Sequence, residues 1–317
     1  MTRPVGETPT RDTPSRFGVF ASVAASTLFG VVFLMAADLE PLNADQLLAW
    51  RLVVTLPVVA VLYTAFKTWA DVRALLSRLR ARPALIAVLV LDGHLLGVQL
   101  WLFGWAPQSG HGLDAALGYL LLPLVMVAVG ALLHRERLAP LRLAAVGSAA
   151  VGVTAAVVLA DGLSWLTLVI ALGIPVYFTV RRRARLDTAG ALGLELLAMT
   201  PFAAWLLAQP STWRPLVDRP TLIPALLLFG LVSATAFLLY TRASAVLPFA
   251  VFGLLGYLEP VLLVIVAATL LDEPLTPADA PVYVPIAVAL GLLAVETLRA
   301  RPVPPRHTQP NRVSPGL

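Results

Sequence analysis

Long apolar stretches separated by short polar segments run through almost the whole chain. A transmembrane helix needs about 20 mainly apolar residues, and ten stretches of about that length can be drawn. They cover approximately residues 17–36, 44–66, 83–105, 113–133, 139–159, 164–180, 188–208, 221–241, 248–271 and 280–298. The pattern predicts an all-α integral membrane protein with ten transmembrane helices.

One part of this pattern occurs twice. Each copy is an apolar run with a glycine, a tyrosine and a proline, followed thirteen residues after the proline by a glutamate in a charged break. The marking residues are Gly118, Tyr119, Pro123 and Glu136 in the first copy, and Gly256, Tyr257, Pro260 and Glu273 in the second. We interpret both glutamates as structural residues at helix ends.

The two copies fall in the fourth and fifth and in the ninth and tenth predicted helices, so each half holds five helices. An odd number of crossings inverts the second half relative to the first. The sequence therefore predicts two inverted five-helix repeats, at residues 17–159 and 164–298. Polar residues 1–16 and 299–317 are expected to be disordered cytoplasmic tails.

The basic residues indicate an orientation. Of the 23 Lys and Arg residues, 20 fall in one set of alternating segments, two in the other set, and Arg51 within a span. The positive-inside rule then places both termini in the cytoplasm. Between the second and third spans, apolar residues at helical spacing predict a short helix on the membrane surface: Trp69, Val72, Leu75, Leu76 and Leu79.

Composition supports this class of protein. The chain is 59% hydrophobic and 13% charged, whereas soluble domains are about 45–50% apolar and about 25% charged. Without cysteine, disulfides and thiolate metal sites are excluded, and the four scattered histidines predict no metal site. No phosphate-binding loop is present, so ATP is not expected as energy source or cofactor. The net charge of +5 reflects topology, not a nucleic-acid partner.

Five ionisable residues lie inside predicted spans, where each costs about 2.5–3.5 kcal/mol at a helix centre. Counted at about 1.5 Å per residue, they reach a common depth near the middle of the bilayer. Carriers built from inverted repeats bind their substrates there. We therefore predict a pathway for substrate or protons that contains Arg51, Asp92, His94, Glu195 and Glu259.

Structural roles remain open for each of them. Arg51 or Glu195 could pair within the protein, and Glu259 could satisfy the backbone next to Pro260. Asp92 and His94, two residues apart, point away from each other on a helix. Glu195 has apolar neighbours on all sides and is the first choice as proton carrier, with Asp92 next.

Further polar residues extend the predicted pathway. Tyr119, Tyr177 and Tyr257 are included, although such aromatics are often packing residues or interface anchors. His111 and Asp114 are placed at the outer mouth, although an acid in a first helical turn is favourable by itself. Asp114 is also the expected partner of Arg51, and Pro175 is expected to kink the sixth span.

In ordered sequence, these residues resemble the EamA group of the drug/metabolite transporter superfamily, and within it the RarD-like permeases. The match covers residues 16–299, and its most specific part is the run His111-Gly112-Leu113-Asp114-Ala115-Ala116-Leu117-Gly118-Tyr119. Further matching positions are Phe29-Gly30, Arg51, Pro123, Glu136-Arg137, Tyr177, Glu195, Pro201, Gly253, Tyr257, Pro260 and Glu273. Departures occur at Gln46, Leu100 and Gly256, where an acid, a tryptophan and a glutamine are common.

The resemblance implies a ten-helix carrier of the plasma (inner) membrane that moves a small organic solute outward through the lipid bilayer. Proton coupling is the favoured energy source, with uniport left open, and a homodimer is one assembly to consider. The alternative is a polytopic membrane enzyme acting on a lipid-linked substrate. Such an enzyme needs a metal cluster, an activated nucleophile or a phosphate-binding loop near one membrane surface, and the sequence shows none.

Overall fold

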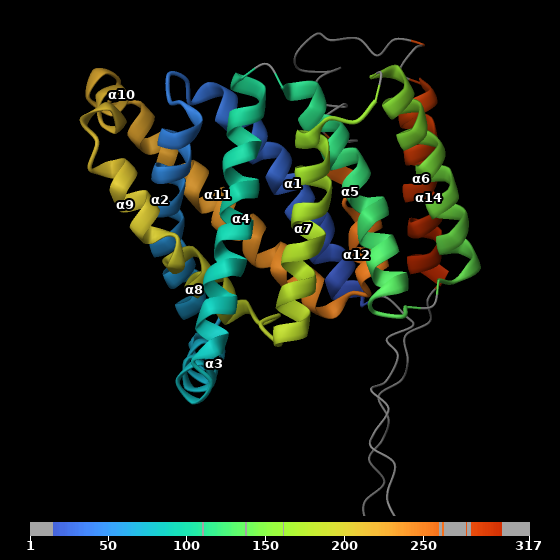
Figure 1. The fold of residues 1–317 in the computed structure, drawn as a ribbon, viewed down its shortest axis with the longest axis horizontal. Helices are drawn as coiled ribbons and strands as arrows, with labels where there is room; N and C mark the ends of the chain where they lie inside the picture. The colour runs from blue at the N-terminus through green and yellow to red at the C-terminus, as the bar shows by residue number, and fades with distance from the viewer. Residues whose placement is uncertain are drawn as a thin grey trace, which may run out of the picture.

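The structure is a computed structural model that describes residues 15–109, 111–136, 138–160, 162–259, 262, 277 and 280–299 of the 317-residue chain. Within these ranges the regular structure is helical and no strand occurs. Long helices run side by side in one bundle (Figure 1). They are α1 (Arg16–Asp38), α2 (Ala44–Ala65), α4 (Ala84–Gln108), α5 (Gly112–Leu132), α6 (Pro140–Leu159), α7 (Trp165–Ala184), α11 (Leu222–Val246) and α14 (Ala280–Arg299).

Shorter helices complete the described part. Two of them lie at opposite ends of the bundle: α3 (Trp69–Ala81) at the bottom of Figure 1 and α10 (Arg214–Asp218) at the top. We call these ends the α3 end and the α10 end. The remaining short elements are α8 (Ala189–Ala198), α9 (Thr200–Leu207), the 3-10 helix η1 (Pro210–Thr212) and α12 (Phe249–Leu255).

The long helices are suited to a membrane. Six described helices are long and apolar enough to cross one, and the bent pair α8–α9 would add a seventh. The apolar parts of α1 and α14 are shorter by the same measure, at Arg16–Val32 and Ala280–Glu296. Large apolar side chains are exposed on the outside of the bundle, including Phe20, Leu132 and Leu159. Because water-facing proteins avoid such extended apolar surfaces, the chain is an all-α, multi-pass membrane protein.

Part of the predicted pattern lies outside the described residues. This applies to nearly half of the predicted span 248–271, to Pro260 and Glu273 in the second copy of the repeat, and to nearly all of both predicted tails. The short helix predicted between the second and third spans is present as α3, which buries Val72, Leu75 and Leu79. Arg78 joins α3 to the end of α7 by donating to the carbonyl of Arg185 at 2.7 Å.

Local sequence explains where several helices begin. At the start of α2, the backbone N–H of Gln46 donates to Asn43 Oδ1 at 2.9 Å, and the backbone N–H of Asn43 donates to Gln46 Oε1 at 3.0 Å. This reciprocal capping box satisfies donors that a helix start otherwise leaves free. Ser164 caps α7 through the N–H of Thr167 at 3.2 Å.

Proline interrupts one span but not the one expected. Helices α8 and α9 meet at Met199 with a bend of 43°, and Pro201 lies in the first turn of α9. Proline lacks the N–H that would continue the helix and its ring displaces the preceding turn. The kink expected at Pro175 does not break the span, because α7 continues through it to Ala184.

Several basic residues at or beyond the ends of the predicted spans lie within helices. Arg181 belongs to α7 and Arg142 to the first turn of α6, with 1% and 2% of their surfaces exposed. Arg242 lies in α11. Arg142 Nε lies 2.8 Å from Glu296 Oε1 and joins α6 to α14. A helix can extend past its apolar stretch when the added charges find partners, and hydropathy alone does not reveal such partners.

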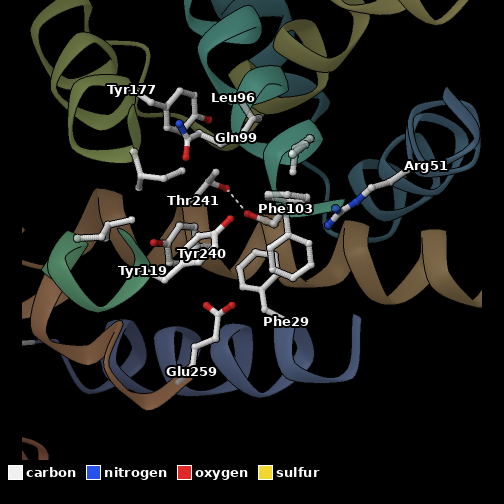
Figure 2. Close-up of a pocket in the computed structure, with 14 residues that line it drawn as sticks. Phe29, Arg51, Leu96, Gln99, Phe103, Tyr119, Tyr177, Tyr240, Thr241 and Glu259 are labelled. Carbon is white, nitrogen blue, oxygen red and sulfur yellow. Dashed lines mark hydrogen bonds between the residues drawn. The ribbon is translucent and has the colours of Figure 1, made fainter. Parts of the chain in front are cut away.

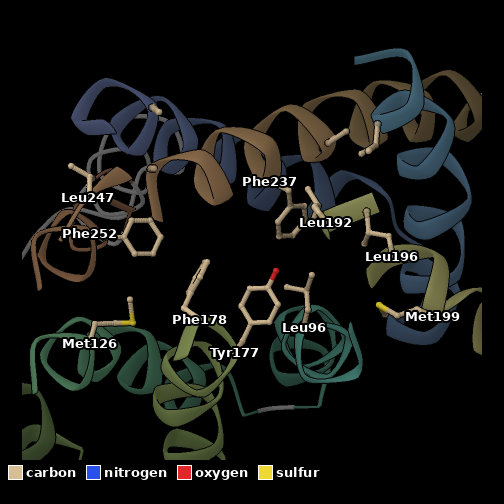
Figure 3. Close-up of a cluster of buried hydrophobic side chains, with 14 of the residues drawn as sticks. Leu96, Met126, Tyr177, Phe178, Leu192, Leu196, Met199, Phe237, Leu247 and Phe252 are labelled. Atoms are coloured by element: carbon tan, nitrogen blue, oxygen red, sulfur yellow. The ribbon is translucent and has the colours of Figure 1, made fainter. Parts of the chain in front are cut away.

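The helices pack around a central core. Helix α1 packs against α11, α6 against α14, and α5 against both α7 and α12. Helix α4 packs against α7 and α8, and α2 against α11 and α9. The largest buried apolar cluster lies where these helices meet, with Phe178 close to Tyr177 and Phe252 (Figure 3). This core adjoins the cavity described next, because Tyr177 belongs to both.

Candidate functional site

A cavity lies in the middle of the bundle and holds about 710 Å³ of empty space, its opening included (Figure 2). Its walls come from α1, α2, α4, α5, α7, α11 and the segment that follows α12. Charged and polar side chains share these walls with phenylalanine rings and aliphatic residues. The polar ones are Arg51, Gln99, Tyr119, Tyr177, Tyr240, Thr241 and Glu259.

Arg51 is the cation of the cavity. It lies on the second turn of α2, only 6% exposed, with its guanidinium carbon 5.2 Å from the ring centre of Phe229 and 5.3 Å from that of Phe237. Within the described ranges, Arg51 makes no ion pair with a carboxylate, and its Nε has no acceptor. The expected pair with Asp114 is therefore absent, and Asp114 contributes its backbone carbonyl to Thr167 Oγ1 at 2.9 Å.

Glu259 is the acid of the cavity. It follows α12, on a different wall from Arg51, with the phenols of Tyr119 and Tyr240 nearby (Figure 2). Among the residues that the structure describes, its carboxylate forms neither an ion pair nor a hydrogen bond. The cavity thus carries two opposite charges that do not neutralise each other directly.

A second polar cluster borders the cavity on the side of the α3 end. The hydroxyl of Tyr177 donates to Glu195 Oε2 at 2.8 Å and accepts from Arg181 Nη1 at 2.8 Å. Arg181 Nη1 also forms an ion pair with Glu195, and its Nη2 donates to the carbonyl of Thr188 at 3.1 Å. Tyr177 therefore connects the cavity wall to a fully buried ion pair between α7 and α8.

Asp92 on α4 completes this cluster. It is fully buried, and neither carboxyl oxygen receives a hydrogen bond from an N–H or O–H group in the described part of the chain. Its carboxyl instead contacts that of Glu195. Gly93 permits this approach, because a Cβ there would lie 2.7 Å from the carbonyl oxygen of Glu195. Two carboxyls can meet in this way when one carries a proton that it donates to the other.

The structure separates the predicted residues into three groups. Arg51, Tyr119, Tyr177 and Glu259 line the cavity, and Asp92 and Glu195 form the adjoining cluster. The others lie elsewhere, and they are His94, His111, Asp114 and Tyr257.

Asp114 bonds through its backbone carbonyl to Thr167, and the other three residues also have local structural settings. His94 is exposed on the outer face of α4, with Nδ1 2.7 Å from the carbonyl of Val90. Tyr257 is buried among the apolar residues between α5, α6 and α14. His111 stacks on Trp105 at 5.3 Å between ring centres, next to the start of α5 at the α10 end.

Sequence reasoning missed Arg181 and Tyr240. Arg181 is one of four clustered basic residues, a pattern typical of a cytoplasmic loop, although it follows Tyr177 by four residues and so shares its helix face. Tyr240 lies in a long apolar stretch that gives no signal. Among the described residues, no group of three or more His, Cys, Asp or Glu could hold a metal ion.

Comparisons with known proteins place the chain among transporters. It is 39% identical over 286 residues to the "Chloramphenicol-sensitive protein RarD" of Pseudomonas aeruginosa, covering 89% of this chain and 95% of the relative. It is 35% identical over 292 residues to an "Uncharacterized transporter" of Haemophilus influenzae, covering 92% and 96%. An "Uncharacterized transporter" of Pasteurella multocida is 33% identical over 281 residues, covering 89% and 96%.

A solved crystal structure has a similar fold, with a TM-score of 0.63 at 20% identity, covering 89% of this chain and 99% of that one. No family model matches the chain. The relatives extend over nearly the whole chain.

Proposed function

Because the chain belongs to the RarD-like permeases of the drug/metabolite transporter type, we propose that it is a secondary transporter of a small organic solute. In this proposal the solute binds in the central cavity, which opens alternately to each side of the membrane. The solute contacts Arg51, Tyr119, Tyr177 and Glu259. The coupled proton is bound and released by the pair Asp92 and Glu195.

The main support for the proposal is that both halves of the chain contribute helices to the cavity walls. The first half of the chain supplies α1, α2, α4 and α5, and the second half supplies α7, α11 and Glu259. Charged residues in a span are costly, and they are typical of transport pathways. A site divided between two halves can be exposed to either side when the halves rock against each other.

The packing supports an arrangement in two inverted five-helix repeats, at residues 17–159 and 164–298. The repeat relates α1 to α7, α2 to α8–α9, α4 to α11, α5 to α12 and α6 to α14. Three of these pairs pack directly: α2 with α9, α5 with α12, and α6 with α14. The contact of α1 with α11 has its counterpart in that of α7 with α4. A two-fold axis in the membrane plane would produce this pattern.

The buried cluster supports coupling to protons. Arg181 supplies the one guanidinium of this cluster and pairs with Glu195 but not with Asp92, so two ionised carboxylates would leave an unbalanced buried negative charge. Uptake of a proton by the pair removes that charge, and its release restores it. Since Tyr177 joins the pair to the cavity wall, the state of the cluster and the binding of solute can influence each other.

The distribution of Lys and Arg supports an orientation with both termini in the cytoplasm, and the resemblance to the RarD-like permeases favours export as the direction. The alternative, an enzyme acting on a lipid-linked substrate, is less well supported, because the buried ionisable groups lie at mid-depth and the relatives are named transporters.

The test is transport by purified protein in proteoliposomes. Vesicles loaded with a mixture of bacterial metabolites are given an imposed pH gradient, and released solutes are identified by mass spectrometry. We expect selective, gradient-dependent release of chemically unchanged solute, which empty liposomes do not show. Chemical conversion of a vesicle component without net movement would instead favour the enzyme.

A further inference from the structure

We propose that the solute of this cavity is zwitterionic, with an anionic and a cationic group at opposite ends of an apolar, ring-like body. The anionic group faces Arg51 and the cationic group faces Glu259. The inference rests on the proposed transport function, because it names the class of solute that the same cavity holds.

Arg51 carries the first part of the argument. A guanidinium buried in a membrane protein is costly unless an anion balances it. Phe229 and Phe237 offer their ring faces at 5.2 and 5.3 Å, which stabilises a cation but supplies no negative charge. No carboxylate pairs with Arg51 in the described ranges, although the side chain lines the cavity. An anionic group on the solute would balance it.

Glu259 carries the second part, independently. Its carboxylate lines the same cavity and has no cationic or hydrogen-bonding partner among the described residues. The groups beside it are the phenols of Tyr119 and Tyr240, which are polar but carry no positive charge. A cationic group on the solute would balance Glu259.

The two charges do not satisfy each other. Arg51 and Glu259 lie on different walls, with Phe29 and Tyr240 among the side chains between them (Figure 2). Their separation exceeds the 4 Å of an ion pair, since no such pair joins them. Because these side chains stand between the two groups, we expect a solute that reaches both to carry its charges at separate ends of its body.

The walls between the charges favour a flat apolar body. Phe29 meets Phe237 edge to face at 5.2 Å and Tyr240 at 5.5 Å between ring centres, and Phe103 meets Tyr119 at 6.0 Å. Rings in such arrangements present both faces and edges to a planar guest. An aromatic or similarly planar body would fit between them.

The test measures binding to the purified wild-type protein by titration calorimetry with matched probes. The zwitterion is 4-(aminomethyl)benzoate, and 4-methylbenzoate and 4-methylbenzylamine each lack one of its charges. Phenylalanine carries both charges on one carbon. We expect 4-(aminomethyl)benzoate to bind at least about tenfold more tightly than any of the other three, because each of those leaves a buried charge unpaired.

Variants assign the two ends. Arg51→Gln should abolish the advantage of the zwitterion over 4-methylbenzylamine and keep its advantage over 4-methylbenzoate, and Glu259→Gln should do the reverse. Arg214→Gln, an exposed change at the α10 end, is the control and should alter neither. If a variant does not fold, the inference is still tested by the four probes on the wild-type protein and by Arg51→Lys, which keeps the positive charge. Equal binding of all probes, no binding of the zwitterion, or equal loss for every probe in both variants would overturn the inference.

The two proposals can fail separately. Binding of the zwitterion without its movement in proteoliposomes would refute transport and leave this inference standing. Transport of 4-methylbenzylamine as fast as the zwitterion would overturn this inference and leave transport standing.

Discussion

Asp92 has the least support from hydrogen-bond donors of the residues in the buried cluster. Both its oxygens lack an N–H or O–H donor in the described part of the chain, and its carboxyl contacts Glu195. A shared proton resolves this contact, and an asparagine amide would imitate the protonated form. We therefore expect Asp92→Asn to fold with a stability within about 1 kcal/mol of the wild type. It should lose solute accumulation driven by a pH gradient.

The measurement is uptake in proteoliposomes, with and without the gradient. Exchange of solute at equal pH should continue in Asp92→Asn, since the cavity itself is unchanged. Asp71→Asn, on the exposed face of α3, is the matched control and should behave as the wild type. Undiminished uphill transport by Asp92→Asn would remove Asp92 as the proton carrier.

The ion pair of Arg181 and Glu195 makes a prediction about stability. Removing one member of a buried pair leaves an uncompensated charge and costs about 3–5 kcal/mol. Arg181→Gln and Glu195→Gln should each lower the midpoint of thermal unfolding in detergent. The double variant leaves two neutral amides and should cost clearly less than the sum of the single losses. Additive losses in this double-mutant cycle would show that the two side chains are not coupled.

At this scale, the sequence indicates depth but not partners. Helical rise places Arg51, Asp92 and Glu259 near the middle of the bilayer, and the structure finds each of them at the cavity or its border. Glu195 appears isolated in sequence because its partner Arg181 comes from another helix and looks like a loop residue. His94 has about the same predicted depth as Asp92, but it lies on the opposite face of α4 and is exposed on the outside of the bundle. Depth alone therefore does not identify a residue of the cavity.

The junction of α11 and α12, at the α3 end, shows how charges fix helix ends. Glu136 accepts hydrogen bonds from the N–H groups of Phe249 at 2.5 Å and Ala250 at 2.9 Å, at the start of α12. Arg182 donates to the carbonyls of Ser244 at 2.7 Å and Leu247 at 2.8 Å, at the end of α11. Each charge opposes the partial charge of the helix end that it meets. The structural role predicted for Glu136 is thereby confirmed, whereas Glu273 lies outside the described residues.

Gly130 tests this junction. A Cβ at Gly130 would lie 2.8 Å from Glu136 Oε2 and 3.1 Å from the backbone nitrogen of Ala250, so Gly130→Ala must displace the carboxylate. We expect the free energy of unfolding to fall by about 1–2 kcal/mol. The measurement is thermal unfolding in detergent. The control is Gly147→Ala on α6, where a Cβ meets nothing within 4 Å, and it should leave stability unchanged or slightly higher. Equal effects of both changes would contradict this role of Glu136.

Helix positions follow from the sequence better than helix ends do. Predicted and observed bounds agree closely for α2, at 44–66 and Ala44–Ala65, because Asn43 caps one end and polar residues follow the other. Helices α7 and α11 extend four and five residues beyond the predicted ends at 180 and 241. In both, arginines continue the helix by binding partners from other elements. Such tertiary contacts have no signature in a hydropathy pattern.

For the whole molecule, hydropathy and charge predict a multi-pass helical bundle, and the structure and relatives confirm that class and the family. Which helices pack together could not be read from the chain, since apolar surfaces facing lipid and facing protein have the same composition. The pairing of α1 with α11 and of α4 with α7 depends on the shape of the contacting faces. The cavity results from this pairing, so its lining could be foreseen only for residues already marked by charge or by the repeat.

Orientation is the remaining property of the whole molecule, and the cysteine-free sequence offers a direct test of it. Ser77 is exposed on α3, and Ser211 is exposed in η1 beside α10, so they mark the two ends of the bundle (Figure 1). The excess of Lys and Arg predicts that the α3 end faces the cytoplasm. In intact cells, a membrane-impermeant maleimide should label Ser211→Cys and leave Ser77→Cys unlabelled. Permeabilised cells should label both variants, which confirms that each thiol is reachable. Labelling of Ser77→Cys alone in intact cells would reverse the orientation, and labelling of both would show that the two ends do not lie on opposite sides of a membrane.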